Sequence, residues 1–504
     1  MLADMTVDPR TPVLVGQGQV LQHIEDLHAA LDPIQLMARA VSRAAIDSAI
    51  TQIPNPDAIF AVRSISSKHA NPAQGVADLL GVSPRRCGTT PNGGNMPQTL
   101  VNIAAREIQA GRMDMAILVG GEATRTRNRA RRNNVTLAWP MAESNVSAPE
   151  LIGEDLALNH EIELNLKIVL PIQIYPMFET ALRAASHRSV DEHQRHIGEL
   201  WSRFSSVAAS NPHAWTQHEY SPSEITSPSK SNRAIGFPYT KMMNSNNDVD
   251  MAAALIICSV GRARSLGIPS DRWIFPQSGT DCHEHNYISH RDAFSETPAV
   301  RLGGVLALQL AKKSLGDIGI IDLYSCFPSA VQLGAQSLGI PLTQQLTCTG
   351  GLSFAGGPWN NYVMHAIATT MIELRERADE TALVWANGGY ATKHAFGIYA
   401  TTPPHEGFRH DSPQGQIDAL PRRGVATPTE AKGPATIESY SVMHDRDGSP
   451  ESLCASTLLA DGRRAWATSR EVDLVSAMTH GEWVGRSAIL DGQGTLRIQE
   501  LTEQ

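Results

Sequence analysis

The sequence lacks any apolar run long enough to cross a membrane. One of its most apolar stretches, residues 251–258, is far shorter than the roughly 20 residues that a transmembrane helix needs. The N-terminal residues MLADMTVDPR are acidic and contain no apolar core of the kind that a secretion signal requires. We therefore expect a cytoplasmic protein without a membrane span.

The sequence also lacks an excess of positive charge and a regular set of cysteines. Its formal net charge is −9, so no general basic field favours a nucleic-acid partner. The cysteines are few and scattered, without the spacing of a disulfide framework, and in a chain of this length we expect reduced thiols. They are Cys87, Cys258, Cys282, Cys326, Cys348 and Cys454.

What is present is the composition of a soluble globular protein. The chain has 504 residues, of which 42% are hydrophobic and 18% charged. This length exceeds an ordinary single core, so we expect two or three domains.

Two parts of the chain share one order of predicted elements and glycine pairs. Each part has a strand, a helix that ends in Leu-Gly, a Gly-Gly pair, a second helix and a second strand that ends in Gly-Gly. The corresponding segments are 56–64, 79–82, 92–94 and 115–119 in the first part, and 317–325, 337–340, 349–351 and 382–386 in the second. Strands that alternate with helices predict parallel sheets covered by helices, so we expect two similar α/β halves packed together.

Residues 123–249, between the two halves, are too many for an ordinary connection. They begin with the basic run RTRNRARR at 125–132. Further on, Ser189 and Glu192 have the spacing of a capping box, and apolar residues at helical spacing predict a helix that ends at Asn-Pro, 211–212. The predicted buried face consists of Ile197, Leu200, Trp201, Phe204 and Ala208. We expect an α-rich subdomain over the junction of the halves.

The composition changes again after about residue 402. Residues 403–433 are polar and contain several prolines, which predicts a linker. Residues 434–504 contain short β-like runs and three Asp-Gly pairs, and the stretch CASTLLA-DG-RRAWATS predicts a hairpin with a two-residue turn. We expect a small antiparallel β domain here, a barrel.

The two repeated halves, the insertion after the first GGE, and the texts SNPHAW and NDVDMAAALIICS resemble thiolases. The closest branch is that of the sterol-carrier-protein thiolases and their bacterial type-1 thiolase-like relatives, which carry an extra C-terminal domain. The resemblance covers about residues 10–400. It implies a thiolase fold with two repeated βαβαβαββ halves, residues 1–122 and 250–402, around a loop domain at 123–249. The text GPATIESYSVMH is similar to the OB-like barrels that accompany some thiolase-type enzymes, which implies such a barrel in residues 434–504.

The resemblance also locates four catalytic loops. Thiolases acylate a cysteine at the N-terminus of a helix, and Gly94 in NGGNMP occupies that position. In YSCFP, Tyr324 and Ser325 replace a polar pair of the family. In SFAGGPWNN, Gly357 replaces the histidine of the Gly-His-Pro loop, and Ala386 in WANGG lies near the place of a second catalytic cysteine. Nucleophile, activating histidine and second cysteine are all absent, so the resemblance implies no thiolysis through an acyl-enzyme.

Other residues near these loops are candidates for a catalytic role, but each of them can instead have a purely structural role in packing. Tyr324 can donate a hydrogen bond to a thioester carbonyl. Cys348, beside TGG, is a nucleophile candidate or an inert buried thiol, and Cys326 keeps a family position but is expected to pack. His394 is a base candidate or a packing histidine. The run DCHEH at 281–285 lacks an ordinary zinc-site spacing, so we expect no metal.

Arg125, Arg127 and Arg129 follow the C-terminal end of a predicted strand, where α/β folds bind ligands. They can pair with coenzyme A (CoA) phosphates, or they form a solvated charged loop. Thiolases usually dimerise through the strand before the nucleophile loop. Here that region, RRCGTTP, is short, basic and ended by Pro91, so the usual thiolase dimer is in doubt.

Three classes of function remain. The first, which we favour, is a protein of lipid metabolism that binds CoA or an acyl-CoA without thiolytic activity and requires no cofactor. The second is an acyl-CoA acyltransferase or hydrolase of altered mechanism that uses Tyr324, Cys348 or His394. The third is a scaffold or regulatory subunit of a lipid-metabolic complex, in which the C-terminal barrel contacts a protein partner.

Overall fold

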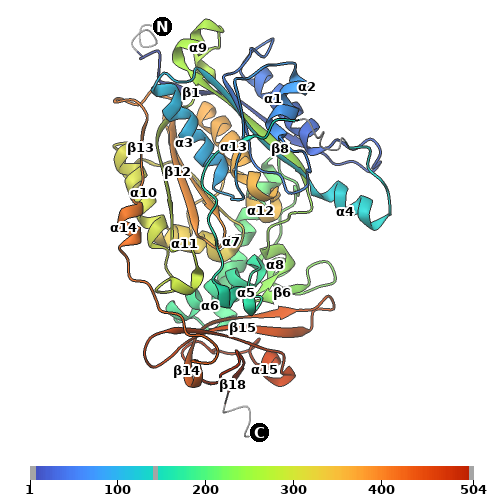
Figure 1. Ribbon diagram of the computed structural model, residues 1–504, viewed down its shortest axis with the longest axis vertical. Helices are drawn as coiled ribbons and strands as arrows, with labels where there is room; N and C mark the ends of the chain where they lie inside the picture. The colour runs from blue at the N-terminus through green and yellow to red at the C-terminus, as the bar shows by residue number, and fades with distance from the viewer. Residues whose placement is uncertain (1–6, 140–145, 499–504) are drawn as a thin grey trace.

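Strands of the first predicted half form a six-stranded sheet in the upper part of the molecule, together with residues 150–151 of the predicted insertion and residues 250–259, which the sequence assigned to the second half (Figure 1). The computed structural model describes residues 7–139 and 146–498. In the order in which they pair, the strands are β1 (Pro12–Leu21), β8 (Asp250–Ser259), β4 (Met115–Ala123), β2 (Ala58–Ala61), β3 (Arg86–Thr89) and β5 (Glu150–Leu151). Strands β4, β2, β3 and β5 are parallel, whereas β8 runs antiparallel to both of its neighbours.

The second half forms a five-stranded sheet of the same mixed kind. In pairing order its strands are β10 (Ile320–Leu323), β11 (Thr381–Gly388), β12 (Lys393–Ala400), β9 (Phe275–His283) and β13 (Arg409–Asp411). Strands β11, β12 and β9 are antiparallel, and β10 and β13 run parallel to their single partners.

Helices fill three layers around the two sheets. The helices α3 (Met96–Gln109) and α13 (Tyr362–Glu376) lie between the sheets and contact strands of both. Helices α1 (Pro33–Asp47) and α2 (Pro72–Leu80) cover the outer face of the first sheet. Helices α10 (Pro298–Leu310) and α11 (Pro328–Leu338) cover the outer face of the second. The predicted α/β architecture of two repeated halves is confirmed.

The Leu-Gly pairs that recur in the two halves have a common structural cause. Gly81 ends α2 and Gly339 ends α11, with φ angles of 66° and 73°. Both are left-handed C-caps, a conformation that glycine adopts without a Cβ penalty.

The insertion between the halves is mostly helical. Its helices are α4 (Thr124–Arg132), α5 (Glu161–Asn165), α6 (Pro171–Ala185), α7 (Val190–Ser210) and α8 (Pro222–Thr226), and two short strands follow, β6 (Ala234–Phe237) and β7 (Tyr239–Thr240). The capping box of Ser189 and Glu192 begins α7 as predicted, and its apolar face is buried. Three short helices complete the two halves: α9 (Val260–Ser265), α12 (Gly351–Phe354) and α14 (Gln414–Asp418).

The edge of the first sheet is covered by a strand that the sequence did not reveal. Strand β5 pairs with β3, so that Gly88 lies opposite Glu150. The Arg86 guanidinium donates two hydrogen bonds, of 2.9 and 2.7 Å, to the Glu150 carboxylate across this pair. The strand before the glycine loop therefore has a partner from its own chain on each side.

The segment that we predicted as a linker, 403–433, contains β13 and α14. Strand β13 extends the second sheet by pairing with β9, and the side chain of Ile417 in α14 is fully buried. These contacts attach the segment to the second half.

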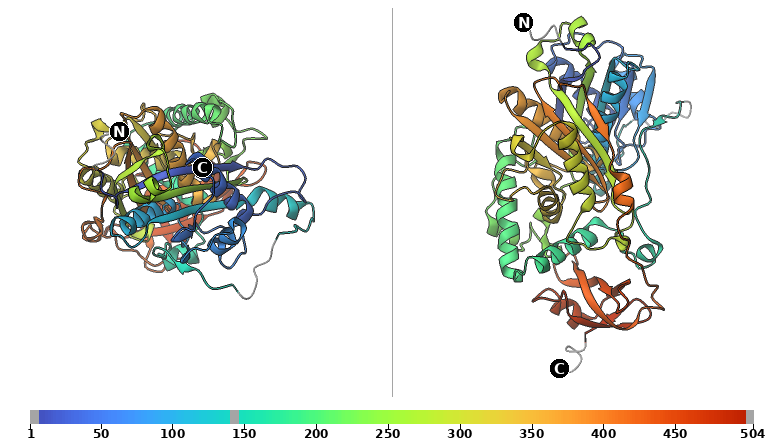
Figure 2. Two further views of the ribbon diagram at one scale, coloured as in Figure 1. Left: turned by 90° about the horizontal axis from the view of Figure 1, so that it is seen from above. Right: turned by 90° about the vertical axis from the view of Figure 1, so that its left-hand side faces the viewer.

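The C-terminal residues form an antiparallel sheet at the end of the molecule opposite the N-terminus (Figure 2). In pairing order its main strands are β16 (Arg464–Ser469), β15 (Pro450–Leu458), β14 (Lys432–His444), β17 (Ser487–Asp491) and β18 (Leu496–Arg497), with α15 (Val472–Ala477) following β16. The expectation of a closed barrel is wrong for the described residues. Strand β16 meets the other end of the sheet at one isolated bridge, between Thr468 and Thr495, the residue before β18, and no ladder joins β16 to the two-residue β18 within the described residues.

The predicted hairpin between β15 and β16 forms, but its turn has three residues. The Leu459 amide donates to the Arg463 carbonyl at 2.9 Å, and the Gly462 amide donates to the Leu459 carbonyl at 2.9 Å. Gly462 has φ of 82°, so the Asp-Gly pair supplies the last two residues of a three-residue turn with a left-handed final position.

None of the helices within 7–139 and 146–498 is long and apolar enough to span a membrane. All six cysteines are free, as predicted, and all except the half-buried Cys87 are buried.

A buried arginine attaches the C-terminal sheet to the second half. Arg464, in β16, has no exposed side-chain surface, and its guanidinium reaches across β15 to pair with Glu438 on β14. The same group donates hydrogen bonds to the carbonyl oxygens of Ser289 and Arg291, both at 2.7 Å, and lies 4.3 Å from the ring centroid of Phe294. With a further bond of 3.1 Å to the Ile288 carbonyl, one side chain thus satisfies a partly buried carboxylate and three backbone carbonyls.

Replacing Arg464 with methionine is expected to lower the free energy of unfolding by about 3–5 kcal/mol, because the Glu438 carboxylate, only 11% exposed, and three backbone carbonyls lose their buried cation. The control is Arg463→Met, since Arg463 is 37% exposed and pairs only at the surface, where an ion pair contributes about 1 kcal/mol or less. Urea unfolding of the two variants measures the difference. Equal losses would contradict the role given to Arg464.

Candidate functional site

The glycine loop before α3 has no space for a side chain. A Cβ atom on Gly94 would lie 2.4 Å from the carbonyl oxygen of Asn387 and 2.4 Å from the hydroxyl oxygen of Tyr324. Both distances are far below van der Waals contact, so a cysteine here would displace loops of the second half. The position that the resemblance assigns to the thiolase nucleophile is closed by the other half of the chain.

Tyr324 follows β10 and places its hydroxyl against this loop. Its side chain is buried, and its ring packs edge-on against Tyr362 with centroids 5.7 Å apart. Burial, and then the neighbouring Cys326, hold the pKa of the phenol well above its ordinary value. Tyr324 is therefore protonated at neutral pH, a hydrogen-bond donor and not a base.

The loop SFAGGPWNN is held by its backbone. Gly356 has φ of 105°, which favours glycine, and the Gly357 amide donates to the Asn246 carbonyl at 2.9 Å. A Cβ on Gly357 would lie 2.9 Å from the side-chain oxygen of Asn247, the end of a side chain that can move. Position 357 therefore tolerates a side chain better than position 94.

The glycine loops of the two halves are joined directly. The side-chain oxygen of Asn360, just after Gly-Gly-Pro, accepts a hydrogen bond from the Gly93 amide at 2.9 Å. Its amide nitrogen donates to the Arg63 carbonyl at 3.0 Å and to the side-chain oxygen of Asn92 at 3.2 Å. Asn360 fixes the first loop against the third, a role that no spacing in the sequence indicates.

The fourth loop is held by Tyr175 of α6. Ala386 is fully buried in β11, and the Asn387 side chain donates to the Tyr175 hydroxyl at 3.0 Å. That hydroxyl donates to the Gly389 carbonyl and accepts from the Ala391 amide, both at 3.0 Å. The inserted helices thus fix the loop that closes over Gly94.

The cysteine candidates are buried thiols. Cys348 borders a cavity of about 230 Å³ with Glu373 and Arg377, and neither Gly94 nor Tyr324 lines that cavity. Burial, and then the nearby Asp322, raise the pKa of the Cys348 thiol well above its ordinary value. Burial raises the pKa of Cys326 to about 12. Both thiols are protonated at neutral pH, so neither has the character of a nucleophile.

His394 is packed inside the second sheet. It lies in β12 opposite Asn387 and Cys282, and its Nδ1 accepts a hydrogen bond from the indole of Trp385 at 3.3 Å. Burial, and then the nearby Arg291, lower the pKa of this imidazole to about 3. It is a weak base without access to solvent.

The polar residues of DCHEH take separate partners. His283 Nδ1 contacts the Glu284 carbonyl at 2.7 Å, and His285 Nε2 contacts the Pro421 carbonyl at 3.2 Å. Glu284 accepts from the Ala299 amide at 2.9 Å. In the part of the chain that the structure describes, no three His, Cys, Asp or Glu side chains are grouped to hold a metal.

The three arginines predicted to meet CoA phosphates lie on α4, and two of them have firm partners. Arg127 donates to the Ile65 carbonyl at 2.7 Å, and Arg129 donates to the Glu25 carboxylate at 2.8 Å. Arg125 is 3.9 Å from the exposed Glu25, and its buried Nε has no hydrogen-bond partner within 7–139 and 146–498. Of the three arginines, Arg125 therefore makes the weakest contacts within the chain and has the most hydrogen-bonding capacity left for a ligand.

Two aromatic residues accompany Arg125. Its guanidinium lies 5.8 Å from the ring centroid of Trp215, and the His23 ring stacks on the same indole at 3.9 Å. Trp215 also donates its backbone amide to the Ala355 carbonyl at 3.0 Å, beside Gly356. The cluster of Arg125, Trp215 and His23 thus adjoins the third loop, although the residues lie far apart in the sequence.

Sequence reasoning also missed a buried amine. Lys393 is 5% exposed, and its Nζ donates to the Asn92 carbonyl. A Cβ on Gly93 would lie 3.0 Å from this nitrogen, and burial lowers the pKa of the ammonium group. Its place beside His394 in TKHAFG was the only signal available.

Comparison with family models identifies residues 413–495 as a "thiolase-like protein type 1 additional C-terminal domain". Among solved structures, the chain is similar to a monomeric SCP2-thiolase like protein type 1 from Mycobacterium smegmatis. The two are 30% identical with a TM-score of 0.83, over 98% of this chain and 99% of that chain. The chain belongs to the type-1 SCP2-thiolase-like proteins. The predicted family, including its extra C-terminal domain, is confirmed.

Two more distant structures share the fold. An "Ltp2-ChsH2(DUF35) aldolase" is 17% identical with a TM-score of 0.58, over 78% of this chain and 98% of that chain. An acetyl-CoA acetyltransferase from Syntrophomonas wolfei is 13% identical with a TM-score of 0.54, over 78% of this chain and 99% of that chain. A search of curated proteins found no match.

Gly94→Ala is expected to lower the free energy of unfolding by about 1–3 kcal/mol, because the added Cβ collides with Tyr324 and Asn387. Adding Tyr324→Phe recovers only part of this loss, since the Asn387 carbonyl belongs to the backbone. Gly415→Ala is the control, because no atom lies within 4 Å of a Cβ at that position. Urea unfolding compares the three variants. If Gly94→Ala matched Gly415→Ala, position 94 would be open.

Proposed function

We propose that this protein binds CoA or an acyl-CoA in lipid metabolism and does not carry out thiolysis. The observation that carries the proposal is the contact of Gly94 with Tyr324 and Asn387. Thiolysis through an acyl-enzyme needs a nucleophile and an activating base within hydrogen-bond reach of one another. Positions 94 and 357 provide neither, and the nearest hydroxyl belongs to a phenol that stays protonated.

Support for a CoA ligand comes from the cluster of Arg125, Trp215 and His23. It adjoins the third loop and begins at the C-terminal end of β4, the edge at which α/β sheets bind ligands. The guanidinium of Arg125 suits a phosphate, because planar N–H donors match phosphate oxygens in pairs. The proposed ligand is a small-molecule thioester or free CoA, and the site requires no further cofactor.

The second class, an acyl-CoA acyltransferase or hydrolase of altered mechanism, rests on Tyr324. Its protonated hydroxyl is a hydrogen-bond donor where thiolases carry their reactive loops, so it can polarise a carbonyl without forming a covalent intermediate. Turnover of an acyl-CoA that is lost in Tyr324→Phe would establish this class.

The third class is a scaffold or regulatory subunit with a protein partner on the C-terminal sheet. A protein that fails to bind any CoA species would favour it. We place the protein in the cytoplasm, in keeping with six free thiols.

CoA is expected to bind the wild-type protein, and Arg125→Ala is expected to weaken that binding about tenfold or more, because it removes charge-assisted hydrogen bonds to phosphate. Isothermal titration with CoA, acetyl-CoA and pantetheine measures both effects. Pantetheine lacks phosphate and should be indifferent to the substitution.

The control for this experiment is Arg132→Ala, an exposed arginine on the same helix. It should leave the affinity for CoA unchanged. Absence of binding by wild-type protein to both CoA and acetyl-CoA would contradict the proposal, and equal weakening by both substitutions would contradict the role of Arg125.

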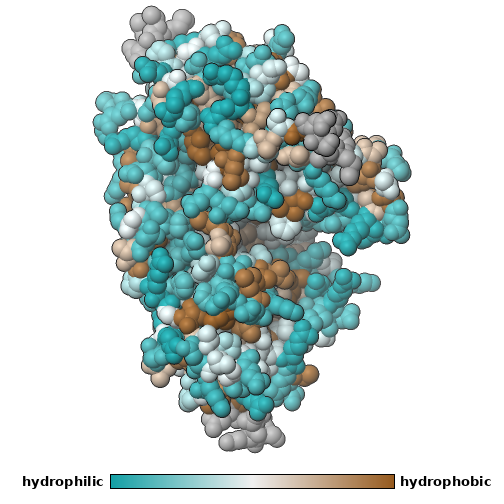
Figure 3. Space-filling view, in the orientation of Figure 1, coloured by the Kyte–Doolittle hydropathy of each residue, from teal (hydrophilic) through white to brown (hydrophobic). Residues whose placement is uncertain are grey.

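We also propose that the chain does not form the usual thiolase dimer. Strand β5 and the ion pair of Arg86 with Glu150 cover the edge of β3. On the face drawn in Figure 3, apolar residues form separate patches within polar surface. The similar structure from M. smegmatis is described as monomeric. Sedimentation equilibrium is expected to give the mass of one chain, 54.5 kDa, whereas twice this value would contradict the proposal.

A further inference from the structure

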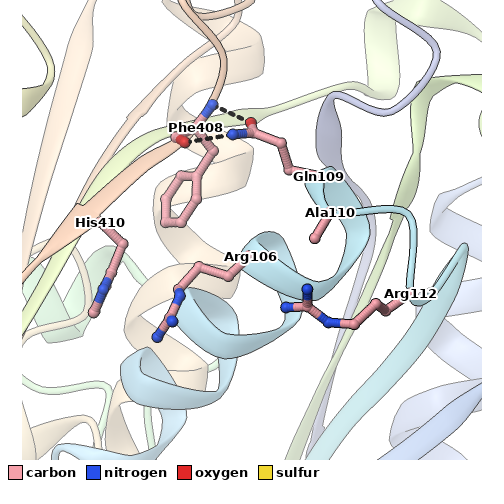
Figure 4. Close-up of a pocket in the computed structure, with 6 residues that line it drawn as sticks. All are labelled: Arg106, Gln109, Ala110, Arg112, Phe408 and His410. Carbon is pink, nitrogen blue, oxygen red and sulfur yellow. Dashed lines mark hydrogen bonds between the residues drawn. The ribbon is translucent and has the colours of Figure 1, made fainter.

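A second cavity lies at the far end of α3 from Gly94. It has a volume of about 360 Å³ and opens to the surface. Its lining residues come from the end of α3 and from the segment that includes β13: Arg106, Gln109, Ala110, Arg112, Phe408 and His410 (Figure 4). Because α3 has 14 residues, roughly 20 Å of helix separate this cavity from the glycine loop.

Most polar groups around the cavity have partners. The amide of Gln109 bonds the backbone of Phe408 twice, donating to its carbonyl at 2.8 Å and accepting from its amide at 2.5 Å. These bonds fix the position of β13 against α3. His410 Nε2 contacts the Asp281 carboxylate at 2.8 Å, which leaves the rest of the imidazole at the cavity wall.

The two arginines that line the cavity, Arg106 and Arg112, differ in their contacts with carboxylates. Arg112 uses Nε and Nη2 for the Glu107 carboxylate, at 2.9 and 2.7 Å, so its Nη1 is not used by that pair. The guanidinium of the exposed Arg106 makes no hydrogen bond or salt bridge with any residue of 7–139 or 146–498, although its charge helps, after Arg112 and Arg86, to lower the pKa of Glu107. Figure 4 shows Arg106 between His410 and Arg112, with the Phe408 ring above it.

The local charge is positive although the whole chain is negative. Arg112 pairs with Glu107, and His410 faces Asp281. Arg86 pairs with Glu150 at 2.7 Å, and its closest nitrogen lies 4.0 Å from Glu107. Arg10 borders the same end of the helix, since a Cβ on Gly111 would lie 3.5 Å from its Cδ. The positive charge of Arg106 is not neutralised by these pairs, in a protein whose formal net charge is −9.

We propose that this cavity binds a phosphate group, either inorganic phosphate or a small phosphomonoester. Arg106 would hold two oxygens with parallel N–H groups, and Arg112 and His410 would contact the group from the two sides. Donors from three directions suit a tetrahedral group better than a planar carboxylate. The site is independent of the CoA proposal, because Arg125 and α4 do not line this cavity.

Bound phosphate would add a bridge between α3 and β13, so it should raise the melting temperature of the whole chain. We would titrate inorganic phosphate and AMP, with acetate and chloride at matched ionic strength as references. Phosphate at concentrations up to about 10 mM is expected to raise the melting temperature more than acetate or chloride does, because a ligand that binds only the folded chain stabilises it. If AMP binds more tightly than inorganic phosphate, the ligand is a phosphomonoester, and the reverse order indicates free phosphate.

Arg106→Ala is expected to weaken phosphate binding about tenfold in isothermal titration, because the unpaired guanidinium is lost. Arg301→Ala, an exposed arginine on α10, is the surface control and should change nothing. Arg125→Ala should also retain the phosphate response, which separates this site from the proposed CoA site. An equal response in Arg106→Ala, or equal responses to phosphate, acetate and chloride, would overturn the proposal.

Discussion

The arrangement of the whole site depends on the close contact between Gly94 and the two loops of the second half. A backbone carbonyl from Asn387 and a hydroxyl from Tyr324 occupy the space that a side chain at position 94 would need. Glycine is the residue that permits this approach, because it carries no Cβ. The contact joins the two halves at the position that the family resemblance assigns to the nucleophile, so the same packing that joins the halves supports the proposal that thiolysis does not occur.

The elements around this contact keep it rigid. Asn360 joins the first and third loops, and Tyr175 holds the fourth. The C-terminal sheet reaches the same region, because Arg464 binds the Arg291 carbonyl and the Arg291 guanidinium donates to the Thr392 hydroxyl at 2.9 Å. These contacts hold the loops in a preformed arrangement. A preformed site lowers the entropic cost of binding a ligand, so the contacts support the proposed role in binding.

The features that could be predicted from the sequence are those set by local rules. The glycines that end α2 and α11, and the capping box that begins α7, follow from backbone preferences of neighbouring residues. The features that were missed depend on contacts between distant segments. Strand β5 has two residues and pairs with the edge of β3, and no ladder closes the C-terminal sheet within the described residues, whose last strand β18 has only two residues. Trp215, His23 and Lys393 reach the site only through the fold.

We propose that the thiolase-like loops of this protein cannot be acylated, because glycine stands at the position of the nucleophile. The most direct measurement is the intact mass of the wild-type protein after incubation with acetoacetyl-CoA and CoA and an acid quench. We expect the unmodified mass and no consumption of substrate, because position 94 has no nucleophile and burial keeps the Cys326 thiol protonated. An acetyl group on any cysteine, formed while the substrate is cleaved, would contradict it.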